Sequence, residues 1–215
     1  MNMPAPKRTS LAKVAGLLKR YQCPVPFHAV RALFMGSLAS PVPDPSPIQA
    51  VQTLWGGEFP PFDTLDDLNN LLHALVDGLW NRLTVHQTAG KPFKLTRTQV
   101  RQTREGLHHY AMVRKQEIEA FMDGLFGPHD ELDLPETARD AVDTLGQIRA
   151  MFEGATNLLA DADVPAAPDS LTGLADNLQA LEPIVEQEIN AVVLSCTRAR
   201  RQLLADPRGS KPTVH

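Results

Sequence analysis

Five basic side chains between residues 97 and 115 offer the clearest chemistry in this sequence. Their separations of three, four and seven residues would place them along one face of an α-helix. The five are Arg97, Arg101, Arg104, His108 and Lys115, which we call the basic stripe. A row of cations can bind an anionic partner, so we predict a partner-binding or anion-binding surface here. The alternatives are a solvated helix face and internal pairing with acidic residues.

Two classes of anionic partner fit the basic stripe. Nucleic acid could bind the basic stripe, because each phosphate charge that a cation neutralises releases counterions. However, the sequence has no recognisable nucleic-acid-reading motif, Tyr110 is the only aromatic residue within the stripe, and the isoelectric point is near 6.0. We therefore expect another protein as the partner. Nucleic acid bound by the basic helix 94–115 is the alternative, and the sequence leaves the oligomeric state open.

A metal site is the second chemistry that this region suggests. Glu105 and His108 have the Glu-x-x-His spacing of di-iron helical bundles, in which the two side chains lie one turn apart. Such bundles need a second copy of the motif and two further carboxylates, and the sequence holds no second Glu-x-x-His. We predict no metal and no cofactor.

Enzyme chemistry has little support in the sequence. There is neither a Gly-x-Ser-x-Gly motif nor a phosphate-binding loop. Cys23 and Cys196 lie far apart, and Cys196 falls on an expected core stripe, where cysteine behaves as a small apolar residue. We predict no catalytic residue. An enzyme with a dispersed site is a further alternative, and its acid–base candidates would be His28, His73, His108 and His109.

Charges of opposite sign are segregated along the chain. Residues 1–31 hold six cations and no acid, residues 91–116 hold seven cations and one acid, and residues 117–188 hold seventeen acids and two cations. Either the blocks neutralise one another in the fold, or a basic face is offered to an anionic partner.

The elements that would position these residues are helices. Apolar residues recur at helical spacing, and no segment sustains the period-two alternation of a half-buried strand. We predict an all-α fold, a multi-helix bundle with antiparallel helices and a proline-rich connection at 41–47. The expected helices cover about residues 11–21, 27–40, 47–55, 64–83, 96–126, 135–160 and 170–200, with a break at Pro183. The expected core stripe of the fourth is Leu65, Leu68, Leu72, Leu75, Leu79 and Leu83.

The domain organisation follows from these elements. We expect a short basic N-terminal helix or arm at 1–24, a single helical domain at 25–205 with a soft break near 161–169, and a flexible tail at 206–215. Trp55 and Trp80 are expected in the core or in a contact between parts of the domain. No apolar run is long enough to cross a bilayer, and two distant cysteines fit a reducing cytoplasm.

Several segments, in this order, resemble a known family. Residues 27–36 (FHAVRALFMG) resemble the early helix of the YgfB and YecA group of small all-helical bacterial proteins. Trp55 with residues 71–83, which end in WNRL, resembles the long helix of that group. Three further segments resemble later helices of that group, namely residues 121–125 (FMDGL), 137–148 and 181–200. Residues 211–215 resemble its tail.

This resemblance covers about residues 25–205 and implies an all-helical bacterial protein, in a group whose members mostly have no assigned activity. The segment 91–115 is more basic than the resemblance implies. The cysteine-rich metal-binding extension of some relatives is missing, so no metal role carries over. We therefore predict a non-enzymatic protein-interaction or regulatory (adaptor) protein of the bacterial cytoplasm.

Overall fold

The computed structural model describes residues 10–42, 45–162 and 167–205. Every regular element in these ranges is a helix, and no residue in them belongs to a β-strand. The all-α prediction is therefore confirmed. The first nine residues of the expected basic arm and the expected tail at 206–215 lie outside the described ranges.

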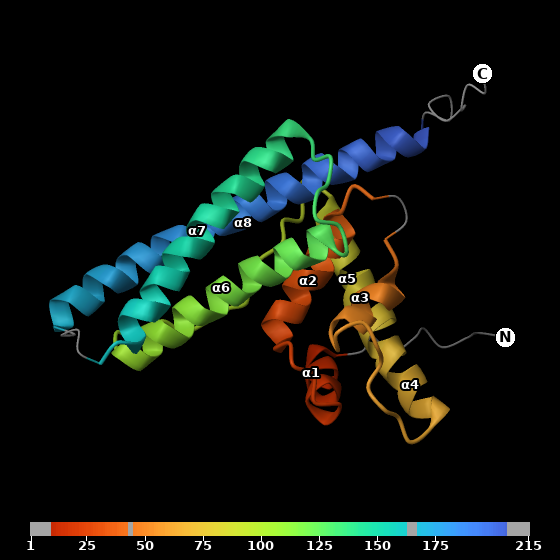
Figure 1. Ribbon diagram of the computed structural model, residues 1–215, viewed down its shortest axis with the longest axis horizontal. Coiled ribbons are helices and arrows are strands. Elements are labelled where there is room, and N and C mark those ends of the chain that lie inside the picture. Colours follow the sequence, from red (N-terminus) through yellow and green to blue (C-terminus); the bar gives the residue numbers. More distant parts are fainter. Residues whose placement is uncertain (1–9, 43–44, 163–166, 206–215) are drawn as a thin grey trace.

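Three long helices form an antiparallel bundle at one end of the molecule. They are α6 (Arg104–Phe126), α7 (Glu136–Ala160) and α8 (Pro168–Ala205), and the chain reverses direction between each pair (Figure 1). At the end of α6, Gly127 adopts a φ of +57°, a conformation that residues with a Cβ rarely take. The bundle buries Phe152 of α7 and Val185 of α8.

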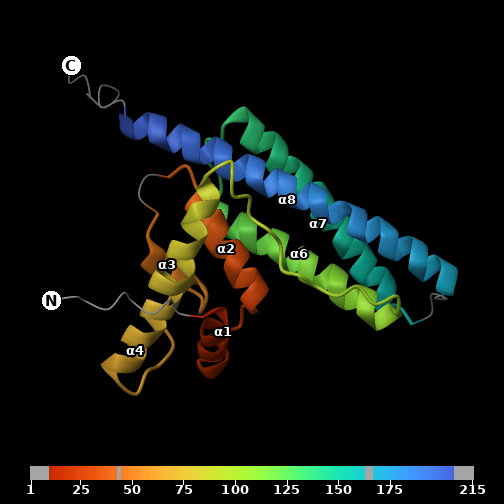
Figure 2. The ribbon, with the colours of Figure 1, turned by 180° about the vertical axis from the view of Figure 1, so that it is seen from behind.

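The shorter helices pack at the other end (Figure 2). They are α1 (Leu11–Arg20), α2 (Phe27–Ala39), α3 (Pro47–Thr53), α4 (Leu65–Leu72), a π-helix (His73–Trp80), α5 (Asn81–Leu83) and a 3₁₀ turn (Thr84–Gln87). Four of the helix starts are fixed by a cap, a Ser or Thr hydroxyl that accepts a backbone N–H. These caps are Ser10, Ser46, Thr64 and Thr103.

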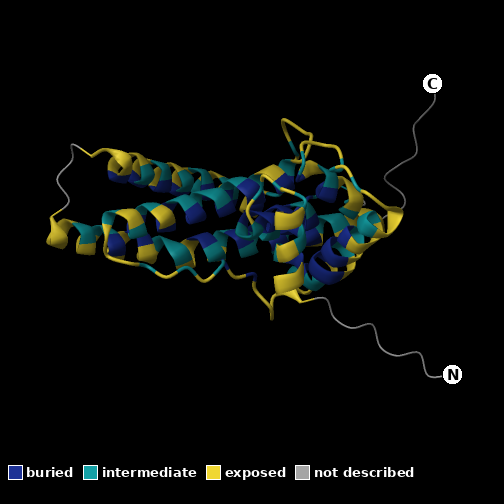
Figure 3. Cartoon of the chain, turned by 90° about the horizontal axis from the view of Figure 1, so that it is seen from below, coloured by how far each residue is buried: buried dark blue, intermediate teal, exposed yellow. Residues whose placement is uncertain are grey.

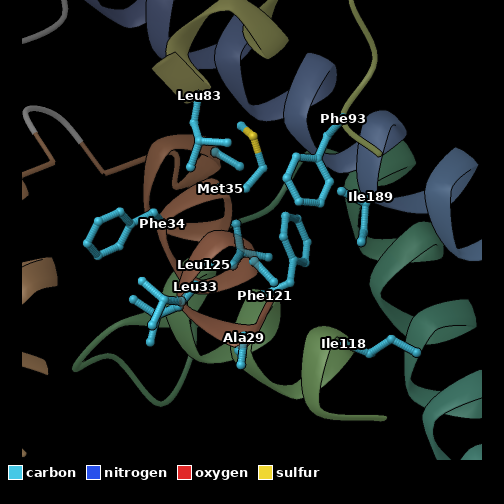
Figure 4. Close-up of a cluster of buried hydrophobic side chains, with 14 of the residues drawn as sticks. Ala29, Leu33, Phe34, Met35, Leu83, Phe93, Ile118, Phe121, Leu125 and Ile189 are labelled. Carbon is cyan, nitrogen blue, oxygen red and sulfur yellow. The ribbon is translucent and has the colours of Figure 1, made fainter. Parts of the chain in front are cut away.

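Helix α2 lies between the two ends and contacts helices of both. Most of its residues are therefore buried, on several faces. Figure 4 shows its side chains meeting Phe121 and Leu125 of α6 on one side and Phe93 on another. Phe34 packs edge-to-face against Trp80 with 5.5 Å between ring centroids. Buried residues are concentrated where the two ends meet (Figure 3). Burial of this apolar surface is the main stabilising contribution.

The structure corrects two expectations about helix regularity. Helix α8 continues through Pro183 without a break, although a proline removes one helical hydrogen bond. The leucine stripe of the fourth expected helix is also partly wrong. Leu65 is 71% exposed, and the π-helical turns change the phase so that Leu71, rather than Leu72, is buried with Leu75.

A third correction concerns the functional region. The helix expected from residue 96 begins at Arg104, where Thr103 caps it. Residues 91–103 run along the outside of α6 without regular secondary structure (Figure 2). The basic stripe is therefore divided between an irregular segment and a helix.

Candidate functional site

A groove of about 760 Å³ lies between segment 96–103 and the first half of α6. Arg97 and Arg101 line it from the segment, Glu105 and His109 from α6, and His28 from α2. Two arginines and two histidines face a single carboxylate among its charged and titratable residues, so the groove is basic.

Side chains of α8 hold the chain just before the groove. The Asn190 side chain accepts from the Phe93 N–H at 2.7 Å and donates to the Phe93 carbonyl at 3.1 Å. One turn earlier, Glu186 accepts the Leu95 N–H at 3.1 Å and pairs with the Lys94 ammonium. Because residues four apart share one helix face, α8 presents a ladder of polar groups to an extended chain.

A buried ion pair in α6 holds the next residue. Arg114 is 1% exposed and Glu117 is fully buried. The Thr96 N–H donates to Glu117 at 2.8 Å, and the Thr96 carbonyl accepts from Arg114 at 2.8 Å. Arg114 also donates to Glu182 of α8 at 2.7 Å, and so does the Tyr110 hydroxyl, also at 2.7 Å. The charges in this cluster are therefore paired and hydrogen-bonded, as buried charges must be.

The cluster shifts the titration of its members. Burial raises the pKa of Tyr110 to about 12, and its hydrogen bond to Glu182 acts in the same direction. Burial alone would lower the pKa of Arg114, but the neighbouring Glu117 and the contacts with Tyr110 and Glu182 raise it overall. The guanidinium therefore stays charged and keeps its place between α6, α8 and the segment.

Helix α2 holds the segment from a third side. Arg31 donates to the Thr96 hydroxyl at 2.8 Å and to the Lys94 carbonyl at 3.1 Å. Its guanidinium also lies 5.3 Å from the centre of the Phe93 ring. Residues 93–96, which we call the anchored segment, are thus fixed by three helices.

The expectation that the basic stripe forms one helix face is wrong. Arg97 and Arg101 precede α6, and Arg104 donates to the carbonyls of Leu159 and Asp161 at the end of α7. The carbonyl groups at a helix C-terminus carry partial negative charge, so they attract this cation.

The remaining two residues of the basic stripe lie within α6. His108 is half-buried there. Lys115 pairs with Glu153 of α7 at 3.0 Å and with Glu119 at 3.8 Å. Only the first two members of the stripe, Arg97 and Arg101, line the basic groove.

Several other cations are engaged inside the fold. Besides Lys115, Arg149 pairs with Glu119 and Glu153, and Arg20 pairs with Asp67. Between the basic block 91–116 and the acidic block 117–188, Lys94, Arg114 and Lys115 each pair with at least one carboxylate, so these two blocks neutralise one another in part. In contrast, Arg97 and Arg101 are exposed and form no ion pair or hydrogen bond with the described residues.

The acid–base candidates do not gather in one place. His28 and His109 line the groove, and His28 contacts Gln116 at 2.8 Å. His73 pairs with Asp77 at 2.7 Å on the exposed side of the π-helix. Across the described ranges, no cluster of three or more His, Cys, Asp or Glu residues could hold a metal ion.

Both cysteines are free thiols. Cys196 is fully buried in the core, as expected, and burial raises its pKa to about 11. Burial also raises the pKa of the Cys23 thiol. Since the thiolate is the nucleophile, neither residue has the electrostatic surroundings of a reactive cysteine.

A second groove, of about 930 Å³, lies between α2, α3 and the end of α6. Leu33, Met122 and Phe126 line it, together with Asp123, and its described lining includes neither Lys nor Arg. Burial, together with the charge of Glu119, raises the pKa of Asp123. This groove therefore lacks the charge pattern that would select an acidic partner.

Sequence reasoning missed the extended course of residues 96–101, although a local signal exists. β-Branched Thr96, Thr98 and Val100 alternate with the polar residues at 97, 99 and 101. This pattern favours a strand-like chain with one face packed, and it competes with the helical spacing of the basic residues.

Comparison with protein families, with curated proteins and with solved structures finds no match to this chain. Among the described helices, none combines the length and the apolar character needed to span a lipid bilayer.

Proposed function

We propose that this chain is a non-enzymatic adaptor or regulatory protein of the bacterial cytoplasm, and that it binds an acidic partner protein at the basic groove. The observation that carries the proposal is a contrast among the cations of this region. Arg97 and Arg101 are exposed and have no partner among the described residues, whereas the cations around them are engaged in the fold. The resemblance to the YgfB and YecA group agrees with this proposal and remains a prediction.

The geometry supports a protein partner better than nucleic acid. Binding to DNA falls with salt by roughly 0.9 logarithmic units per phosphate contact for each tenfold rise in salt. Two free arginines would therefore lose only about twelvefold in affinity between about 50 and 200 mM salt. Proteins that bind DNA by charge use many more contacts. A protein partner would add shape complementarity and hydrogen bonds to these charge contacts. Such a partner suits a groove in which two arginines are left without a described partner.

An enzyme with a dispersed site is the weaker alternative. His28 and His109 are possible acid–base groups, but the described residues that line the groove include no Ser or Cys nucleophile. The hydroxyls of its threonines, Thr96, Thr98 and Thr103, are engaged in hydrogen bonds. In the adaptor, the same histidines supply hydrogen-bonding groups to the groove.

The test is recovery of binding partners from bacterial lysate with tagged full-length protein. The Arg97→Glu/Arg101→Glu variant is compared with wild type and with Arg198→Glu/Arg201→Glu. The control variant makes the same change of charge on exposed residues near the end of α8, at the opposite end of the bundle (Figure 1). All samples are run with and without nuclease and analysed by mass spectrometry.

We expect a defined protein to survive nuclease, to be lost from the groove variant and to be kept by the control variant. Recovery of nucleic acid alone would favour the alternative. A partner recovered equally with all three proteins would overturn the assignment of the groove.

A further inference from the structure

The backbone of residues 97–101 has a fixed course but lacks partners in the part of the chain that the structure describes. Within the described chain, none of its N–H or C=O groups makes a hydrogen bond. The preceding anchored segment differs sharply. Helix α8 pairs with both backbone groups of Phe93 and with the Leu95 N–H, α6 pairs with both backbone groups of Thr96, and α2 pairs with the Lys94 carbonyl. Unpaired groups along an extended chain are the feature that lets a sheet edge accept another strand.

The exposure of these residues has the period of a β-strand. Arg97, Gln99 and Arg101 are exposed, whereas Thr98 and Val100 are half-buried. Val100 packs against a small core cluster that includes Leu107, Leu159 and Ala175, from all three long helices. One face of segment 97–101 is therefore attached to the bundle, and the other presents two arginines.

Both ends of segment 97–101 are held in place. The anchored segment precedes it, and Thr103 follows it and caps α6 by accepting the Gly106 N–H at 3.1 Å. Gly106 also permits the segment to approach α6 closely. A Cβ at this position would lie 2.6 Å from the Arg101 Cβ and 2.7 Å from the Arg101 carbonyl oxygen. A ligand would therefore meet a preformed edge rather than a chain that must first be ordered.

We propose that segment 97–101 binds an extended acidic peptide of the partner protein by strand addition. The groove beside it has the volume of a ligand site and is basic. Side chains four positions apart lie on the same face of a strand, about 13 Å apart at roughly 3.3 Å per residue. The residues opposite Arg97 and Arg101 are then also four positions apart in the ligand, in either strand direction.

The ligand class is thus a peptide with two acidic residues four positions apart in an extended stretch. Main-chain hydrogen bonds provide affinity, and the two arginine–carboxylate pairs provide specificity. This inference rests on the proposed function, since it defines how the partner occupies the basic groove.

The test uses synthetic peptides of about ten alternating Thr and Val residues that carry a fluorescent label. One peptide has two Glu residues four positions apart, and the control has them three positions apart. Spacing by three places carboxylates on one face of a helix but on opposite faces of a strand. Binding to the full-length protein is measured by fluorescence anisotropy. We expect at least about tenfold tighter binding for spacing by four, the equivalent of one charge-assisted contact.

Backbone methylation tests the hydrogen bonds directly. Alternate amides of a strand point to opposite edges, so methylation of one alternate set should lower the affinity about tenfold or more, and methylation of the other set should not. The Arg97→Glu/Arg101→Glu variant should lose the peptide, and Arg198→Glu/Arg201→Glu should keep it. Equal effects of the two methylated sets, equal affinity for both spacings, or no binding of either peptide would overturn strand addition.

The two proposals fail in different ways. If the groove variant loses its partner from lysate while the peptides show no dependence on spacing or methylation, strand addition is wrong and the adaptor function stands. If no partner depends on Arg97 and Arg101, the adaptor function at this groove is wrong, whatever the peptides do.

Discussion

The Asn190 side chain hydrogen-bonds to both backbone groups of Phe93, although the two residues are 97 positions apart in the chain. Its amide oxygen accepts the Phe93 N–H and its amide nitrogen donates to the Phe93 carbonyl. Asn190→Ala would leave both backbone groups without these partners beside a buried phenyl ring. We expect a loss of about 2–4 kcal/mol in the free energy of unfolding, from one to two unsatisfied polar groups.

Urea unfolding checks this loss, and hydrogen exchange at the Phe93 and Leu95 amides locates it. The control is Asn157→Ala, an exposed asparagine in α7. This change should leave stability the same or slightly higher, because alanine is the better helix former. Unchanged protection of the Phe93 amide in Asn190→Ala would contradict the assigned role.

Gly36 and Gly124 allow α2 and α6 to touch through their backbones. A Cβ at Gly36 would lie 2.0 Å from the Phe121 carbonyl oxygen, and one at Gly124 would lie 2.0 Å from that of Leu33. We expect Gly36→Ala and Gly124→Ala each to lower the free energy of unfolding by about 3 kcal/mol or more, since the helices must separate.

Gly154→Ala is the matched control for this helix crossing. Gly154 lies within α7 with no atom within 4 Å of the added Cβ. Here the same substitution should raise stability by about 0.5–1 kcal/mol, because glycine is the poorer helix former. Thermal unfolding of the three variants would contradict the close crossing if all three changed in the same direction.

The buried pair of Arg114 and Glu117 gives a third prediction. Arg114→Met would leave the carboxylate of Glu117 buried without its cation, and we expect a loss of about 3–5 kcal/mol. Arg149→Met removes an arginine from a partly exposed group of ion pairs and should cost about 1 kcal/mol or less. Chemical unfolding of both variants under the same conditions compares them. Similar losses would show that burial of the first pair contributes little.

Tyr110 gives a pH-dependent prediction. Its pKa is raised from about 10 in an unfolded chain to about 12 in the fold, so the folded state holds the proton more tightly. The resulting stabilisation, about 2–3 kcal/mol for two pKa units, is fully present below pH 10 and is lost as the pH rises towards 12. Stability should fall less steeply over this range in Tyr110→Phe than in wild type. Parallel curves of unfolding free energy against pH would refute this.

The elements that the sequence predicted well have local causes. The expected helix start at 64 and helix end at 126 agree with the structure, where Thr64 caps one helix and Gly127 follows the other. The preferences of these two residues act within one turn. The course of residues 93–101 has a distant cause, since Glu186 and Asn190 hold the backbone from about 90 residues away. Helical spacing of the basic residues therefore placed Arg97 and Arg104 on one face by coincidence, and the β-branched residues at 96, 98 and 100 were the competing local signal.

The last prediction concerns Gly106, which positions segment 97–101 without lying in it. In Gly106→Ala the new methyl group would meet the Cβ and the carbonyl oxygen of Arg101, so the segment must move away from α6. Because the anchored segment and Val100 are fixed elsewhere, we expect a change of about 1 kcal/mol in stability but a several-fold loss of affinity for the partner protein. Gly146→Ala, in α7 with open space around the added Cβ, is the control and should bind normally. Fluorescence anisotropy with the acidic peptide and recovery of the partner from lysate both measure the effect. Full binding by Gly106→Ala would mean that the close approach of the segment to α6 is not needed for recognition.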